Sequence, residues 1–240
     1  MRFYKFFISI FLIFTMCFYI TTPVFSEETT YVWSPNNNSL NDSTNDNSSQ
    51  VKETNSEVDE SNSLSLESGS AILIEQTTGQ VLYSHNAHEQ LRPASVTKVM
   101  SILLIMEALD SNKISLTDSV PCSENAASMG GSQIWLDPRE TLTVDEMLKA
   151  ICVNSANDCV VAMSEFVAGS EEAFVQLMND KAKELGMNDT CFKNCHGLDE
   201  DGHVTSAYDI SLMSRELLNN HPSVTNYTTI WTDTLRNRKI

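Results

Sequence analysis

The chain has 240 residues and a formal net charge of -17, which excludes a nucleic-acid binder that works through a basic surface. The charge is unevenly distributed: Arg2 and Lys5 give residues 1–26 a charge of +2, nine acids and one lysine give residues 27–68 a charge of -8, and residues 69–240 carry -11. Because the three stretches also differ in composition, each predicts a different kind of structure.

Residues 1–26 predict a cleaved signal peptide for export. Arg2 and Lys5 precede an uncharged, mostly apolar run over residues 6–20, and Ser26 supplies the small residue of a cleavage site. The run is shorter than the roughly 20 residues that a membrane-spanning helix needs. An uncleaved anchor is the alternative, as is a lipoprotein attached through Cys17, although the residues before Cys17 match that pattern poorly.

Residues 27–68 predict a disordered acidic linker. Ser, Thr and Asn occupy 22 of its 42 positions, so the segment cannot bury enough apolar surface to offset the entropy of ordering. We expect a flexible spacer on the outer side of a membrane.

Residues 69–240 are long enough for one domain with a hydrophobic core. Residues 70–75 and 79–84 flank a tight turn and predict a β-hairpin. Pro93 then opens a helix over residues 94–109, which is apolar on nearly every side and is therefore expected to be buried all round. Since an isolated hairpin is marginal in water, further strands should complete its sheet, and the sequence provides none.

Helix-capping patterns mark the remaining helices. Thr143 and Glu146 form a capping box ahead of an apolar run. Three further caps are predicted: Asn157 for a helix over 159–168, Ser170 for a helix that ends at Gly186, and Ser206 for a helix that runs to Asn219 before Pro222.

The cysteines predict no definite set of disulfide bonds. Without the signal peptide five remain, an odd number, at positions 122, 152, 159, 191 and 195. A zinc site is an alternative for Cys191, Cys195, His196 and His203, but their spacing matches no familiar zinc finger and cysteine is also a common small core residue. We therefore expect no metal.

Ser95 and Lys98 are the first candidates for chemistry. They are three residues apart at the start of the apolar helix, so the Lys98 amine can reach the Ser95 hydroxyl. A buried lysine can be neutral enough to take the serine proton, and the free N–H of Ser95 can donate to an oxyanion. Ser-x-x-Lys alone is a weak pattern, and an N-cap serine with a surface lysine is the alternative.

A second polar cluster lies between two apolar helices at residues 153–158. Ser155 and Asn157 could point from this turn toward Ser95. An asparagine-rich capping turn with no catalytic role explains the same residues.

Taken together, the segments of the chain resemble the low-molecular-mass penicillin-binding proteins that are serine D-alanyl-D-alanine carboxypeptidases. The resemblance rests on six segments in the same order, at residues 78–83, 92–95, 129–132, 154–158, 196–198 and 205–209. It implies an α/β (α+β) fold of the β-lactamase/transpeptidase type. It also implies that Ser95 is the acyl-enzyme nucleophile, Lys98 its base, Ser155 a proton relay to the leaving D-alanine, and Asn157 a ligand of Lys98 and the substrate amide. The segments around Met129 and His196 are interpreted as architectural.

The third motif of this family, Lys-Thr-Gly, does not occur in the chain. In the family its strand provides a lysine for the substrate carboxylate and a second oxyanion donor. We therefore expect a C-terminally truncated carboxypeptidase domain over residues 69–240 that is inactive or unstable alone.

The resemblance implies a peptidoglycan stem peptide as substrate and β-lactam antibiotics as covalent inhibitors, with no cofactor. It places the protein outside the cell, on the membrane face or in the wall, and in contact with the membrane only through its leader or a missing C-terminal anchor. A non-catalytic wall-binding protein with the penicillin fold is one alternative. A class A β-lactamase is a weaker one, because Ala156 stands where that class has aspartate.

Overall fold

The computed structural model describes residues 66–236 and 238–239. The expected signal peptide, and all of the expected linker up to residue 65, lie outside the described residues. In chain order the described elements are β1 (Ala71–Ile74), β2 (Val81–His85), the 3₁₀ helix η2 (Ala94–Thr97), α2 (Lys98–Asp110), β3 (Ser119–Pro121), α3 (Glu124–Ala127), β4 (Thr141–Thr143), α4 (Val144–Asn154), α5 (Asn157–Ala168), α6 (Glu171–Glu184), α7 (Ala207–Asn220), η3 (Pro222–Val224), α8 (Thr225–Thr228), β5 (Thr234–Leu235) and β6 (Arg238–Lys239).

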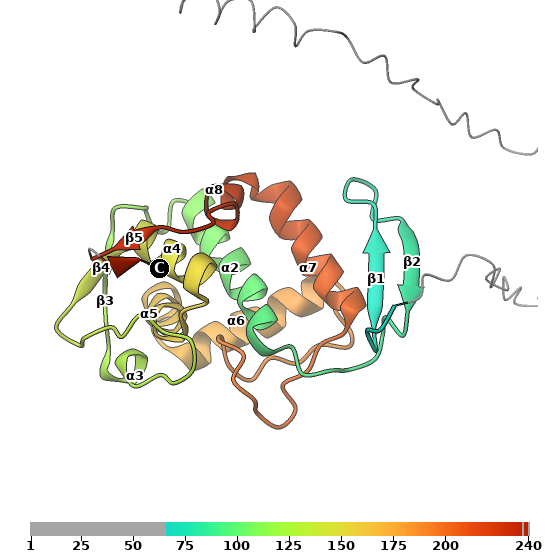
Figure 1. The fold of residues 1–240 in the computed structure, drawn as a ribbon, viewed down its shortest axis with the longest axis horizontal. Coiled ribbons are helices and arrows are strands. Elements are labelled where there is room, and N and C mark those ends of the chain that lie inside the picture. Colours follow the sequence, from blue (N-terminus) through green and yellow to red (C-terminus); the bar gives the residue numbers. More distant parts are fainter. Residues whose placement is uncertain (1–65, 237, 240) are drawn as a thin grey trace, which may run out of the picture. The chain divides into compact units, whose positions relative to one another are not determined.

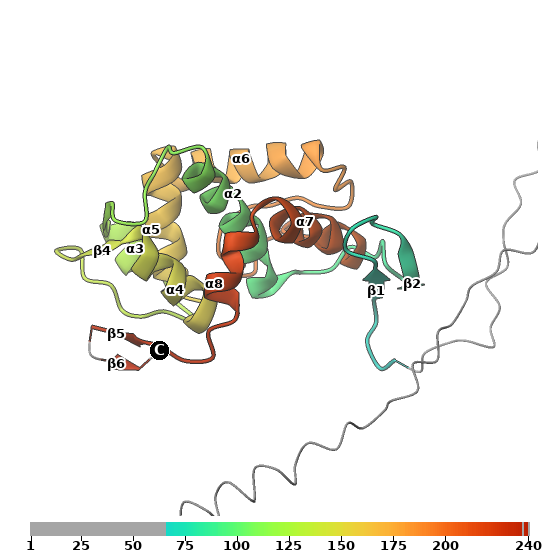
Figure 2. The ribbon, with the colours of Figure 1, turned by 90° about the horizontal axis from the view of Figure 1, so that it is seen from above.

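The predicted hairpin is present as the antiparallel pair β1 and β2, in which Ala71 faces His85. Glu75 holds the turn because its carboxylate accepts hydrogen bonds from Thr78 and Thr77, which lower the pKa of Glu75 to about 2. Helix α7 lies between α2 and the hairpin (Figures 1 and 2). In the described part of the chain, each of the three sheets has two strands.

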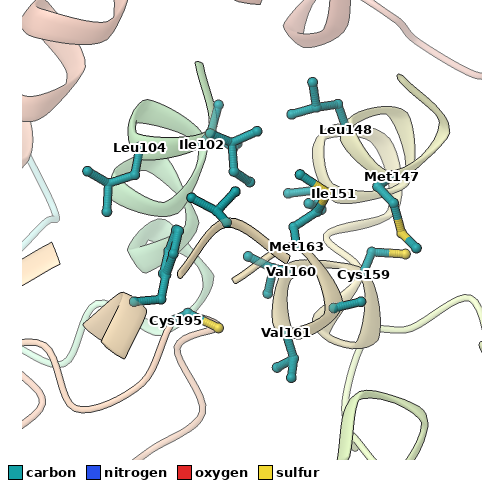
Figure 3. Close-up of a cluster of buried hydrophobic side chains, with 14 of the residues drawn as sticks. Ile102, Leu104, Met147, Leu148, Ile151, Cys159, Val160, Val161, Met163 and Cys195 are labelled. Carbon is teal, nitrogen blue, oxygen red and sulfur yellow. The ribbon is translucent and has the colours of Figure 1, made fainter. Parts of the chain in front are cut away.

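Helix α2 is the centre of the core, as its all-round apolar sequence predicts. It packs against α5, α6 and α7, and its residues from Met100 to Met106 are all buried. In Figure 3, Ile102 lies on the side of α2 that faces the apolar side chains of α4 and α5, whereas Leu104 points to the other side of α2. The predicted helix over 94–109 differs in its first turn, which is the 3₁₀ helix η2, so α2 itself begins at Lys98.

Three of the four predicted caps are confirmed. Thr143 and Glu146 form both hydrogen bonds of a capping box, and Ser170 and Ser206 accept from the N–H groups of Ala173 and Asp209. The cap predicted at Asn157 is wrong: α5 begins at Asn157 itself, and the Asn157 side chain donates instead to a carbonyl of another loop.

Two small antiparallel sheets have no counterpart in the sequence-based prediction. Strands β3 and β4 precede α4, and the polar stretch after Ile230 forms β5 and β6. Arg236, in the turn between β5 and β6, makes an ion pair with Glu140 at 2.8 Å and also donates to the carbonyl of Ile134. This side chain fastens the end of the chain to the loop before β4.

Among residues 66–236 and 238–239, no helix has the length and apolar character needed to cross a membrane.

Substitution of Thr143 tests the capping box of α4. Thr143→Ala removes the acceptor of the Glu146 N–H, so we expect the free energy of unfolding to fall by about 1 kcal/mol. Urea denaturation of the full chain measures this loss. Glu146→Gln keeps an acceptor for the Thr143 N–H and should cost less than half as much. Equal losses in the two variants would contradict the reciprocal cap.

Candidate active site

Ser95 and Lys98 meet at the start of α2. Ser95 is exposed, whereas the Lys98 side chain is buried and only 3% of the residue is accessible. The Lys98 amine donates to Ser95 Oγ at 3.3 Å and to the carbonyl oxygen of His196 at 2.7 Å. The structure therefore joins the two residues as their spacing predicts, and it adds a backbone acceptor that the spacing does not reveal.

Burial lowers the pKa of Lys98 from 10.5 to about 8. With this pKa, roughly one lysine in ten is neutral at pH 7, against fewer than one in a thousand for an exposed lysine. A neutral amine within hydrogen-bond distance of a serine hydroxyl can accept its proton, so the pair has both the geometry and the basicity of a nucleophile and its base.

The loop over residues 194–198 lies directly against this pair. Its Cys195 carbonyl accepts a hydrogen bond from the buried Ser101 hydroxyl at 2.6 Å, and its His196 carbonyl accepts from Lys98. Gly197 has a positive φ of 91°, and a Cβ atom at this position would lie 1.9 Å from the carbonyl oxygen of Ala94. Only glycine therefore allows the loop to approach the turn that presents Ser95.

Ala94 is itself strained. Its φ is +47°, in the left-handed region that non-glycine residues rarely occupy. Such conformations persist only where surrounding contacts enforce them, and they gather at functional sites. Here the close approach of Gly197 supplies the contact.

The second polar cluster forms the junction between α4 and α5. Helix α4 ends at Asn154, Ser155 takes a left-handed conformation with φ +55°, and α5 begins at Asn157. Asn154 and Asn157 both hold the loop before β4: Asn154 Nδ2 donates to the carbonyl of Gln133, and Asn157 Nδ2 donates to that of Gly130 at 2.7 Å.

Asn157 keeps one polar atom without a partner among the described residues. Asn157 is 3% exposed, and its Oδ1 has no hydrogen-bond partner among the described residues. The expected bond between Asn157 and Lys98 is not among the hydrogen bonds of the described residues, so the structure leaves the Asn157 oxygen available to another donor. Ser155 is half-buried, and the roles predicted for both residues stay predictions.

Asp158 is a residue of this region to which the sequence assigned no role. It is fully buried, and its carboxylate accepts the backbone N–H groups of Ile134 and Leu136 at 3.1 and 3.0 Å. An acid in the first turn of a helix suggests only a favourable interaction with the helix dipole. Its contact with a loop more than 20 residues away depends on tertiary structure.

The residues weighed as a zinc site are engaged in other contacts. His203 Nε2 pairs with Thr97 Oγ1 at 2.7 Å, while its Nδ1 accepts from the N–H of Lys193. Cys191 lies in a bridge to Val204, and Cys195 contacts Glu171. In the part of the chain that the structure describes, no three His, Cys, Asp or Glu side chains are grouped to hold a metal, and the five cysteines there are free.

Comparisons with known proteins all indicate the same family. The Peptidase S11 family, described as D-alanyl-D-alanine carboxypeptidase, matches residues 53–240. The chain is 57% identical to D-alanyl-D-alanine carboxypeptidase DacF from Bacillus subtilis over 173 residues, which is 72% of this chain and 44% of that relative. The chain spans less than half the length of the curated relatives it matches.

Solved structures share the fold. Penicillin binding protein 6B from Escherichia coli superposes with a TM-score of 0.69 at 32% identity, over 72% of this chain and 56% of that chain. Penicillin-binding protein D2 from Listeria monocytogenes, in its ampicillin-bound form, superposes with a TM-score of 0.65 at 29% identity, over 74% of this chain and 72% of that chain. These likenesses confirm the expected β-lactamase/transpeptidase-like fold.

Replacement of Gly197 tests the close approach that shapes the site. Gly197→Ala and Gly186→Ala both place a side chain at positive φ, but only the first also creates a clash, because nothing lies within 4 Å of a Cβ at Gly186. We expect Gly197→Ala to lower the free energy of unfolding by about 1–3 kcal/mol more than its control. Urea denaturation measures the difference, and equal losses would show that the loop does not press on Ala94.

Proposed function

The chain belongs to the D-alanyl-D-alanine carboxypeptidase family, and we propose that it carries the serine and lysine of a site that removes the terminal D-alanine from peptidoglycan stem peptides. The observation that carries the proposal is the hydrogen bond from the buried Lys98 amine to the exposed Ser95 hydroxyl. The family match and the B. subtilis relative support the same substrate class.

The proposed reaction has two steps. Lys98 takes the proton of Ser95 while Ser95 Oγ attacks the carbonyl carbon of the penultimate D-alanine, and the N–H of Ser95 donates to the oxyanion. The bond to the terminal D-alanine then breaks, and Ser155 passes the proton held by Lys98 to the departing amine, which leaves Lys98 neutral. Water then attacks the resulting ester and gives a proton to Lys98, which returns it to Ser95 Oγ as the shortened peptide leaves.

Asn157 is proposed to hold the substrate amide. Its Oδ1 is buried and has no partner among the described residues, and such an atom is costly unless a donor reaches it. A peptide N–H of the substrate or the third N–H of the Lys98 ammonium would satisfy it.

The Lys-Thr-Gly motif associated with the family is not among these 240 residues. Loss of one oxyanion donor costs roughly 10²–10³ in turnover, so we expect the 240 residues by themselves to acylate slowly. The alternative is a wall-binding protein with the same fold and no catalysis.

We further propose that the protein acts outside the cytoplasm. The substrate lies there, and the basic, apolar and small-residue order of residues 1–26 supports export. Residues 27–68 would then serve as the spacer between the membrane and the domain. The family relation, and the ampicillin-bound structure of the Listeria relative, support β-lactams as covalent inhibitors of Ser95.

Labelling by a fluorescent penicillin tests the proposal. We expect slow covalent modification at Ser95, with a rate that rises about tenfold per pH unit below pH 7 and levels off above the Lys98 pKa of about 8. The sign follows because Lys98 accepts a proton only when it is neutral, and its protonated fraction falls as the pH rises. Intact-mass spectrometry over pH 6 to 10 measures the adduct.

Ser95→Ala is the control and should form no adduct. Reversible binding without any mass increase, even at millimolar penicillin, would overturn catalysis in favour of the binding protein. Equal labelling of Ser95→Ala would instead assign the reaction to another residue.

A further inference from the structure

An acidic residue contacts the loop segment that binds Lys98, and it has no role in the reaction proposed above. Glu171 is the first residue of α6, and its side chain contacts the two-residue segment Cys195–His196. We infer that Glu171 is a positioning residue for Lys98 and that it acts through this segment. The inference rests on the proposed function, because it takes Lys98 as the base of Ser95.

Three contacts join Glu171 to the Cys195–His196 segment. Its Oε1 accepts from the backbone N–H of Cys195 and from the Cys195 thiol, each at 3.3 Å, and it lies 3.5 Å from Nε2 of His196. Its side chain is only 18% exposed, so these contacts form away from bulk water, where charge interactions are less screened.

The same two-residue segment contacts α2. The Cys195 carbonyl accepts from Ser101 and the His196 carbonyl accepts from the Lys98 amine. A shift of this segment would therefore move the acceptor that orients the Lys98 amine toward Ser95. Glu171 is the side chain of α6 that holds this segment in place.

The His196 ring does not cancel the charge of Glu171. Its Nδ1 accepts from the N–H of Leu198 at 3.1 Å, so the neutral ring carries its proton on Nε2, which points at Glu171. Burial lowers the pKa of His196, and the ring is therefore mostly neutral at neutral pH. The ring then leaves the negative charge of Glu171 uncancelled, and we expect this charge to favour the protonated form of Lys98.

Other titratable groups near Lys98 have different partners. On the 194–204 segment, Glu200 accepts from Asn194, and the neutral form of His203 is favoured by burial, which lowers its pKa. On the same loop, burial raises the pKa of the Cys195 thiol well above its usual range, so this group is uncharged. Glu171 is the carboxylate that contacts both Cys195 and His196.

Two substitutions separate charge from position. Glu171→Gln removes the charge and keeps an oxygen acceptor, while Glu171→Ala removes both. Glu172→Gln is the matched control, because it removes the same charge from the same turn of α6 at an exposed side chain outside these contacts.

The primary measurement is the titration of the Lys98 amine by ¹⁵N NMR in the full 240-residue chain. We expect Glu171→Gln to lower the Lys98 midpoint by about half a pH unit, because a nearby negative charge no longer stabilises the ammonium. Glu172→Gln should leave it within about 0.1 unit at physiological salt. An unchanged midpoint in Glu171→Gln, or the same shift in both variants, would overturn the inference.

Penicillin acylation gives a second measurement. The pH midpoint of labelling should move with the Lys98 titration in Glu171→Gln, and the maximal rate should fall about tenfold or more in Glu171→Ala because the amine is less well oriented. An unaltered maximal rate in Glu171→Ala would contradict the positioning role. The NMR titration does not depend on acylation. A wild-type chain that never acylates would therefore refute the proposed function, while the titration would still test the role of Glu171.

Discussion

The burial of one lysine is the constraint on which the site depends. The Lys98 amine lies in a region of apolar helix and can be held there only where hydrogen bonds replace water. The Ser95 hydroxyl and the His196 carbonyl supply two of these bonds. The same burial that costs stability lowers the pKa of Lys98 to about 8, so it also increases the fraction of neutral amine that can accept a proton near neutral pH.

The loops around the lysine are held by acids at helix starts. Asp158 and Glu171 occupy the first turns of α5 and α6, where negative charge is favoured by the helix dipole. Both carboxylates are also turned to backbone N–H groups of a distant loop: Asp158 to the loop before β4, and Glu171 to Cys195. Two acids that are locally favourable at a helix start therefore also hold the loops beside Ser155 and Lys98.

Local features of the sequence predict most of the helical part. The capping box at Thr143, the caps at Ser170 and Ser206, and the apolar character of α2 all depend on neighbours within a few residues, and the structure confirms them. The β3–β4 and β5–β6 pairs escape prediction because their strands are only two or three residues long. The spacing of Ser95 and Lys98 likewise predicts their contact, since both lie on one turn.

The remaining contacts of the site join chain segments that are not neighbours in the sequence, and two of them join segments about 100 residues apart. Nothing near Lys98 in the sequence shows that the His196 carbonyl accepts a hydrogen bond from its amine, nor that Ala94 requires a glycine at position 197. Asn157 shows the same limit: its place before an apolar run favours a cap, yet the Gly130 carbonyl offers its amide a tertiary partner instead. With Nδ2 engaged there, Oδ1 stays buried and without a partner among the described residues. The wrong cap and the proposed substrate ligand therefore have one cause, which is the loop that crosses the start of α5.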